Sequence, residues 1–174
     1  ELSDSAFWNI VSSYSEPEQP FTHYLVSNET FFPNLVTNLL ALNVRGGGYI
    51  GVAPEQNYHY IAAIRPQIAF IMDIRRQAII QHLMFKAVFE LSPDRADFIS
   101  LLFTKPRPAG IPANATAFQV WTAFWFINTD TSKFNANMNR VFDQLTKKHK
   151  FALNTADSAL LRFTYTAFYT AGPS

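Results

Sequence analysis

The chain of 174 residues contains no cysteine, which excludes a disulfide framework, a zinc ribbon and a cysteine nucleophile. It also lacks an excess of charge, because 14 basic and 13 acidic residues leave a net charge of +1. The basic patch that binds nucleic acid or an anionic membrane is therefore not indicated. No apolar run is long enough to span a bilayer. We expect one domain, or part of one, without a nucleic-acid or membrane partner.

Several catalytic motifs are missing as well. The sequence has neither the G-x-S-x-G turn of the hydrolases nor the G-x-x-x-x-G-K-[ST] loop of the P-loop proteins. The four histidines, His23, His59, His82 and His149, are scattered and show no H-E-x-x-H or H-x-x-x-H spacing. A metal site is therefore not predicted.

Aromatic residues, in contrast, are abundant at 16% of the chain, and 17 of them are phenylalanine. They indicate an aromatic-rich core or interface. Residues 117–127 are apolar on nearly all sides and include Trp121, Phe124, Trp125 and Phe126. We expect a helix here that is covered either by a missing C-terminal half or by a second copy of the chain.

The rest of the chain is organised around residues 46–76, which predict a strand, a loop, a helix and a second strand. Residues 48–52 and 68–72 are short apolar runs typical of buried strands. Between them, Glu55 to Arg65 has helical periodicity, and Pro66 ends it. The two strands are expected to be adjacent and parallel, because a helical crossover joins parallel neighbours.

Such a unit forms a crevice at the carboxyl ends of its strands, where open α/β sheets bind ligands. Gly51 ends the first strand and Asp73 follows the second, about 20 residues later. That spacing suits a tight turn near the ligand and an acid that accepts hydrogen bonds from ribose hydroxyls. The G-x-G-x-x-G motif is incomplete, and the alternative is a plain strand–helix–strand unit in which Asp73 caps the next helix.

Other polar residues flank the same crevice. Glu55, Gln56 and Asn57 lie where the helix begins and could hydrogen-bond a charged or amide group of a ligand, or else cap the helix. Arg75 could hold a carboxylate or a phosphate, or else belong to a solvated first turn.

The pattern predicts one domain over residues 1–174, with a helical segment 1–45, the strand–helix–strand core 46–91 and a helical region 92–174. We expect an α/β fold of Rossmann-like type, a mostly parallel sheet flanked by helices. Beyond the two clear strands, only Phe21 to Val26 and Phe151 to Leu153 are further candidates. Two strands are too few for an open sheet, so we expect the N-terminal half of a larger domain.

Five segments together resemble a bacterial family of uncharacterised proteins that is similar to class I S-adenosylmethionine-dependent methyltransferases. They are SNETFFPNL, YIGVAPEQNYHYIA, IAFIMDIRRQ, HLMFKAVFELSPDRADFISLLF and ADSALLRFTYTAFYTAGPS. The resemblance implies that the loop at Gly51, Ala53 and Glu55 contacts the methionine part of the cofactor and that Asp73 binds its ribose. Ala53 stands where the resemblance implies a glycine.

The resulting hypothesis is an S-adenosylmethionine-dependent methyltransferase whose acceptor is unknown. The alternative from another class is a non-catalytic domain that binds a different ligand or a protein. A third is a nicotinamide enzyme, in which Asp73 would suit NAD and Arg75 with Arg76 would suit NADP. A methyltransferase would be cytoplasmic, because its cofactor is made there. A start at Glu1 also leaves export after signal-peptide cleavage open.

Overall fold

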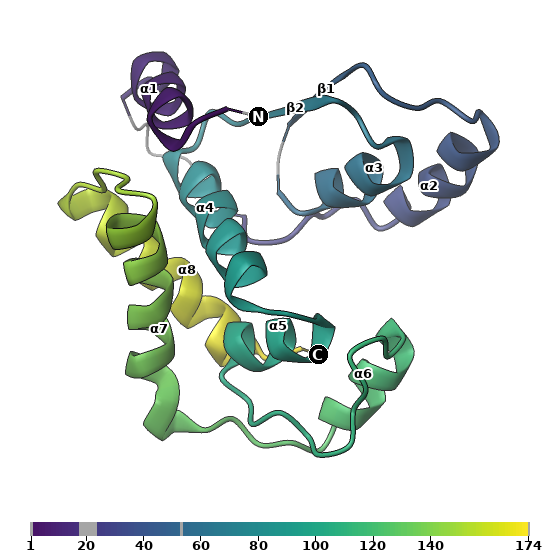
Figure 1. Cartoon of the computed structure of the whole chain (residues 1–174), viewed down its shortest axis with the longest axis vertical. Coiled ribbons are helices and arrows are strands. Elements are labelled where there is room, and N and C mark those ends of the chain that lie inside the picture. The colour runs from purple at the N-terminus through teal and green to yellow at the C-terminus, as the bar shows by residue number, and fades with distance from the viewer. Residues whose placement is uncertain (1, 18–23, 53, 174) are drawn as a thin grey trace. The chain divides into compact units, whose positions relative to one another are not determined.

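The computed structural model describes residues 2–17, 24–52 and 54–173, and these form two compact units. One unit spans residues 16–82, and the other joins residues 1–15 to residues 83–174. Helix α4, Arg76–Leu91, contributes its first turns to one unit and the remainder to the other. The two units are described separately below (Figure 1).

The unit 16–82 contains the predicted strand–helix–strand arrangement. Strands β1 (Gly48–Val52) and β2 (Ile68–Met72) pair in parallel, with Gly48 opposite Ile68 and Val52 opposite Met72. Helix α3 (Gln56–Ile64) connects them, and helix α2 (Phe32–Ala41) precedes β1 and packs against α3. The prediction of adjacent parallel strands joined through a helix is confirmed.

Local sequence explains where these elements begin and end. Gly46 and Gly47 have positive φ angles of 73° and 70°, which lets the chain turn sharply into β1. Arg65 takes a left-handed conformation at the end of α3, and Pro66 follows it. The chain therefore reverses within a few residues and β2 can pair beside β1.

The two faces of the β1–β2 sheet differ in what covers them. Gly51 is buried on the same face as Tyr49. The opposite face consists of large apolar side chains that are 42–70% exposed: Ile50, Val52, Ile68, Phe70 and Met72. Parallel sheets are normally covered on both faces, so this bare apolar face is unusual.

Among its described residues, the other unit contains helices and irregular segments but no β-strand. Its core contains Met84, Val88, Leu101, Val141 and Leu161, which are at most 4% exposed. Its elements are α1 (Asp4–Tyr14), the second part of α4, α5 (Arg95–Phe103), α6 (Ala117–Phe124), η1 (Thr131–Lys133), α7 (Phe134–Asp143), the π-helical turn η2 (Gln144–Lys148) and α8 (Thr155–Ala171).

Caps fix most of these helices. Ser3 is the N-cap of α1 and accepts from the Ala6 N–H, and Asp94 is the N-cap of α5 and accepts from the Asp97 N–H. Asn154, rather than Asp157 or Ser158, is the N-cap of α8. Asp157 instead completes a capping box by accepting from the backbone N–H of Asn154.

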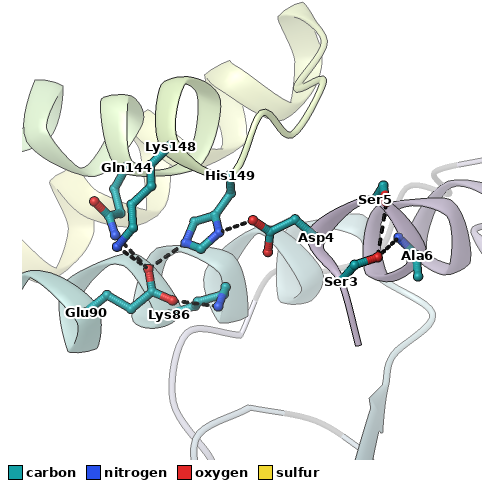
Figure 2. A network of polar contacts seen from close by, with 9 residues as sticks. All are labelled: Ser3, Asp4, Ser5, Ala6, Lys86, Glu90, Gln144, Lys148 and His149. Atoms are coloured by element: carbon teal, nitrogen blue, oxygen red, sulfur yellow. Dashed lines mark hydrogen bonds and ion pairs between the residues drawn. The ribbon is translucent and has the colours of Figure 1, made fainter. Parts of the chain in front are cut away.

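A polar network ties α1 to the end of α4 and to η2 (Figure 2). His149 lies between two carboxylates, with Nδ1 2.8 Å from Asp4 and Nε2 2.5 Å from Glu90. Glu90 also accepts from Lys86 and Gln144, each at 2.6 Å. These bonds hold the amino-terminal helix against a segment that is distant in sequence.

The expected Rossmann-like fold is wrong. The described residues form eight α-helices and are predominantly helical, and they contain only a two-stranded parallel sheet. Of the two further strand candidates, Tyr24–Val26 and Phe151–Leu153 are irregular, and residues 21–23 lie outside the described residues. Apolar residues are instead spaced for helix packing over most of the chain.

Candidate ligand site at the carboxyl edge of the sheet

Gly51 and Asn57 form the centre of the edge where β1 ends. The Asn57 amide donates to the carbonyl oxygens of Val52 at 3.0 Å and Pro54 at 2.9 Å, and its Oδ1 accepts from the Tyr49 hydroxyl at 2.7 Å. A Cβ on Gly51 would lie only 1.9 Å from Asn57 Oδ1. The glycine is therefore required by a side chain of the protein itself, and Asn57 fixes the turn from β1 into α3.

Asp73 follows β2 at the same edge and is paired with Arg75. Its Oδ1 accepts from the Arg75 backbone N–H at 2.9 Å and from Nε at 2.8 Å, and its Oδ2 accepts from Nη2 at 2.5 Å. Burial raises the pKa of the Asp73 carboxyl, but the hydrogen bonds from Arg75 outweigh this effect and the pKa is lowered overall. The Asp73 side chain is 3% exposed.

Glu55 lies at the start of α3, and its side chain binds the chain preceding α2. Both of its carboxylate oxygens accept from the backbone N–H of Ser27, at 2.9 and 3.1 Å. Glu55 does not cap α3 through its side chain. Its structural role is thus to fasten residue 27 to the strand–helix turn.

Three buried polar atoms in this unit have no hydrogen-bond partner among the residues that the structure describes. They are Gln56 Oε1 at the start of α3, Arg75 Nη1 after β2, and Gln77 Oε1 in the first turn of α4. Gln56 and Arg75 follow the carboxyl ends of two paired parallel strands, so both belong to one edge of the sheet. Buried polar groups in folded proteins almost always have a partner, so each of these atoms requires an explanation.

A second set of side-chain hydrogen bonds in the same unit was not predicted from the sequence. Gln77 donates to Gln81 at 2.8 Å, and Gln81 donates to the Leu25 carbonyl at 2.5 Å. The Tyr58 hydroxyl lies 2.7 Å from His82 Nδ1, and burial raises the tyrosine pKa. The sequence contained a signal for these contacts. Gln77 and Gln81 are four residues apart between apolar positions of one helix, so they share a buried helix face.

The structure thus assigns different roles to the seven predicted site residues. Gly51 and Asn57 are in contact and shape the turn, Asp73 and Arg75 are paired, and Glu55 binds Ser27. Gln56 keeps an unpaired acceptor. Ala53 lies outside the described residues.

No group of three or more histidine, aspartate or glutamate side chains is placed to hold a metal ion within residues 2–17, 24–52 and 54–173. No helix in these same ranges is both long and apolar enough to cross a bilayer.

Comparison with known proteins identifies a family. Residues 24–112 match the family described as a domain of unknown function, DUF7790, and this region includes β1, α3, β2, α4 and α5. No curated protein and no solved structure matches the chain. Because the family match covers more than half of the sequence and the whole candidate site, the chain belongs to the DUF7790 family.

Proposed function

We propose that this protein binds S-adenosylmethionine at the carboxyl edge of the β1–β2 pair and serves methyl transfer. The observation that carries the proposal is the pair of unpartnered buried atoms there, the Gln56 Oε1 acceptor and the Arg75 Nη1 donor. The methionine part of this cofactor has an ammonium group and a carboxylate. An amide oxygen and a guanidinium N–H are complementary to those two groups.

The ribose of S-adenosylmethionine fits this edge less well than the methionine part does. Asp73 already accepts three hydrogen bonds from Arg75, so at most one lone-pair position of its carboxylate is left. Asp73 is therefore a positioning residue in this proposal, because it holds the guanidinium while Nη1 remains available. A hydrogen bond from a ribose hydroxyl would require Arg75 to give up one of its bonds.

The proposal requires only that this chain bind and orient the cofactor. When bound, S-adenosylmethionine supplies a methyl group on a positively charged sulfur. Gln56 and Arg75 would bind and orient its amino-acid part, and Asn57 would keep the turn from β1 to α3 in one conformation. Rate enhancement would then rest on proximity and alignment of the acceptor.

A second candidate function is a non-catalytic binding domain. It is favoured by the fact that the carboxylates of Glu55 and Asp73 both accept hydrogen bonds from the protein itself. Neither carboxylate is left as a general base at this edge. In this alternative the edge binds another small molecule with an amino-acid group.

Calorimetric titration of the purified chain with S-adenosylmethionine, its demethylated product, NAD and NADP separates these possibilities. We expect both methionine-containing ligands to bind and both nicotinamide ligands to give no heat. Gln56→Leu removes the unpartnered acceptor and should weaken binding about tenfold, the scale of one hydrogen bond. Gln67→Leu is the matched control, since Gln67 is exposed and lies before β2, at the opposite edge.

The outcomes are distinct. Absence of heat with S-adenosylmethionine would overturn the cofactor proposal. Binding of free methionine or another amino acid in its place would support the second candidate. Equal loss of affinity in Gln56→Leu and Gln67→Leu would show that the ligand site is elsewhere.

A further inference from the structure

A cavity of about 450 Å³ lies in the helical unit between the end of α4, α5, α6 and the C-terminus. Its volume is in the range of sites that hold drug-sized ligands, roughly 300–1,000 Å³. The cavity is separate from the β1–β2 edge, so its function does not depend on the function proposed above.

The cavity has aromatic walls and is lined on another side by members of a buried apolar cluster. Phe89 and Phe98 line one side with ring centroids 4.7 Å apart, and Trp121 lines another. Val120 and Phe124 form the floor and belong to a buried cluster with Ala96 and Ala115. A lining of aromatic side chains over a packed floor suits an apolar ligand.

Three polar side chains break the apolar lining: Ser92, Asp94 and Arg95. The Ser92 hydroxyl is buried and has no hydrogen-bond partner within the described part of the chain. Asp94 is ionised and paired with Arg107, which donates to its two oxygens at 2.7 and 2.8 Å and lowers the pKa of this carboxyl to about 2. The same guanidinium lies 2.8 Å from Asp97.

Arg95 is the basic residue of the cavity lining, and it is exposed. It donates to the Ala115 carbonyl at 3.3 Å and forms no ion pair among the described residues. A guanidinium has five N–H donors, so most of its donor capacity is unused. The cavity therefore combines an apolar lining with the Ser92 hydroxyl, which has no hydrogen-bond partner among the described residues, and the Arg95 guanidinium, which has no ion-pair partner among them.

We infer that this cavity binds an amphipathic carboxylate, a molecule with an apolar body and a single carboxylate group. The apolar body fills the space between Phe89, Phe98 and Trp121. The carboxylate pairs with Arg95 and accepts from the Ser92 hydroxyl. Guanidinium groups recognise carboxylates through paired hydrogen bonds, whereas an amine or a neutral alcohol offers no such acceptor pair.

Two kinds of molecule share this chemistry, a flexible acyl chain and a flat aromatic acid. Decanoate and 2-naphthoate represent them, and decanol and decylamine are the uncharged and cationic controls. Titration of the full chain with each, followed by tryptophan fluorescence and calorimetry, measures affinity. We expect one or both carboxylates to bind at least tenfold more tightly than decanol, and decylamine not to bind.

Variants connect this binding to the cavity. Arg95→Gln should weaken carboxylate binding at least tenfold and leave the affinity for decanol unchanged. Arg140→Gln is the matched control, because Arg140 is an exposed arginine of α7 that does not line the cavity. Ala117→Trp places a large ring in the cavity from an exposed helix position and should abolish binding of every probe.

The inference is overturned if neither carboxylate binds the wild-type chain. It is also overturned if Arg95→Gln and Arg140→Gln weaken binding equally, or if Ala117→Trp folds, as shown by circular dichroism, and still binds. Binding of decanol as tight as that of decanoate would reject the role of Arg95.

Discussion

The carboxylate of Asp73 is almost fully buried and is held by three hydrogen bonds from Arg75. The spacing from Gly51 suggested that this carboxylate either binds a ribose or caps the next helix, but in the structure the nearby Arg75 donates to both of its oxygens. The local ion pair therefore decides which group Asp73 binds in the free protein.

Replacing Asp73 tests this ion pair. Asp73→Asn keeps the shape but leaves the buried guanidinium without its anion, so the free energy of unfolding should fall by about 3 kcal/mol. The exposed Asp143–Lys147 pair on α7 and η2 provides a control, and Asp143→Asn should cost less than about 1 kcal/mol. Urea unfolding followed by circular dichroism measures both. Similar losses would show that Asp73 is not held as described.

The carboxylate of Glu90 makes the other prediction at this scale. Partial burial opposes its ionisation, but hydrogen bonds from Lys86, His149 and Gln144 lower its pKa from 4.5 to about 2. Because the folded-state pKa is below the unfolded one, Glu90 contributes stability above pH 4.5 and loses it as the pH falls towards 2.

Glu90→Gln should therefore lower the free energy of unfolding by about 1–3 kcal/mol above pH 4.5. The gap between wild type and variant should close as the pH approaches 2. Thermal melts over this pH range measure it, with Asp143→Asn as the control for loss of an exposed carboxylate. A gap that stays constant with pH would contradict the network in Figure 2.

Strand β1 shows how a helix side chain restricts a neighbouring strand. Asn57 from α3 occupies the space that a side chain at Gly51 would need, whereas Gly48 in the same strand has only a methyl group of Ile68 nearby, at 3.9 Å. Gly48 therefore has room for a side chain, whereas Gly51 does not.

Gly51→Ala should lower stability by about 2–3 kcal/mol, because the new methyl group displaces Asn57 and its bonds to the turn. Gly48→Ala should be neutral or slightly stabilising, since an alanine loses less conformational freedom on folding. Chemical denaturation of the two variants in parallel gives the comparison. If both tolerate alanine equally, Asn57 does not fix the turn.

At the scale of the whole molecule, exposed apolar surface occurs in both units. The bare face of the β1–β2 sheet is one such surface, and α6 with the residues after it is another, where Phe118, Trp125 and Phe126 are 59–88% exposed. Apolar patches of this kind promote association of copies in solution.

We expect the chain to self-associate at micromolar concentration, as size-exclusion chromatography with light scattering would show. Ile50→Lys places a charge on the bare sheet face and should reduce association. Trp125→Lys tests α6 in the same way. Lys147→Glu, on an exposed turn, is a charge-change control and should leave association unchanged. A monodisperse wild-type monomer would contradict the expectation.

The sequence by itself determined the local elements of this protein. Periods of apolar residues, a cap such as Ser3 and a breaker such as Pro66 fix helices and strands through interactions within a few residues. The pairing of β1 with β2 also followed from the sequence, since a short helical crossover between two apolar runs requires parallel neighbours.

Only the tertiary structure decided the partners of each side chain. Glu55 binds Ser27 and Glu90 binds His149 across long stretches of sequence, and no spacing rule indicates such pairs. The apolar cavity beside Arg95 is equally a product of packing, because its walls come from helices that are separate in the sequence. Residue patterns report local geometry, but which polar atoms remain unpaired depends on the contacts of the folded chain.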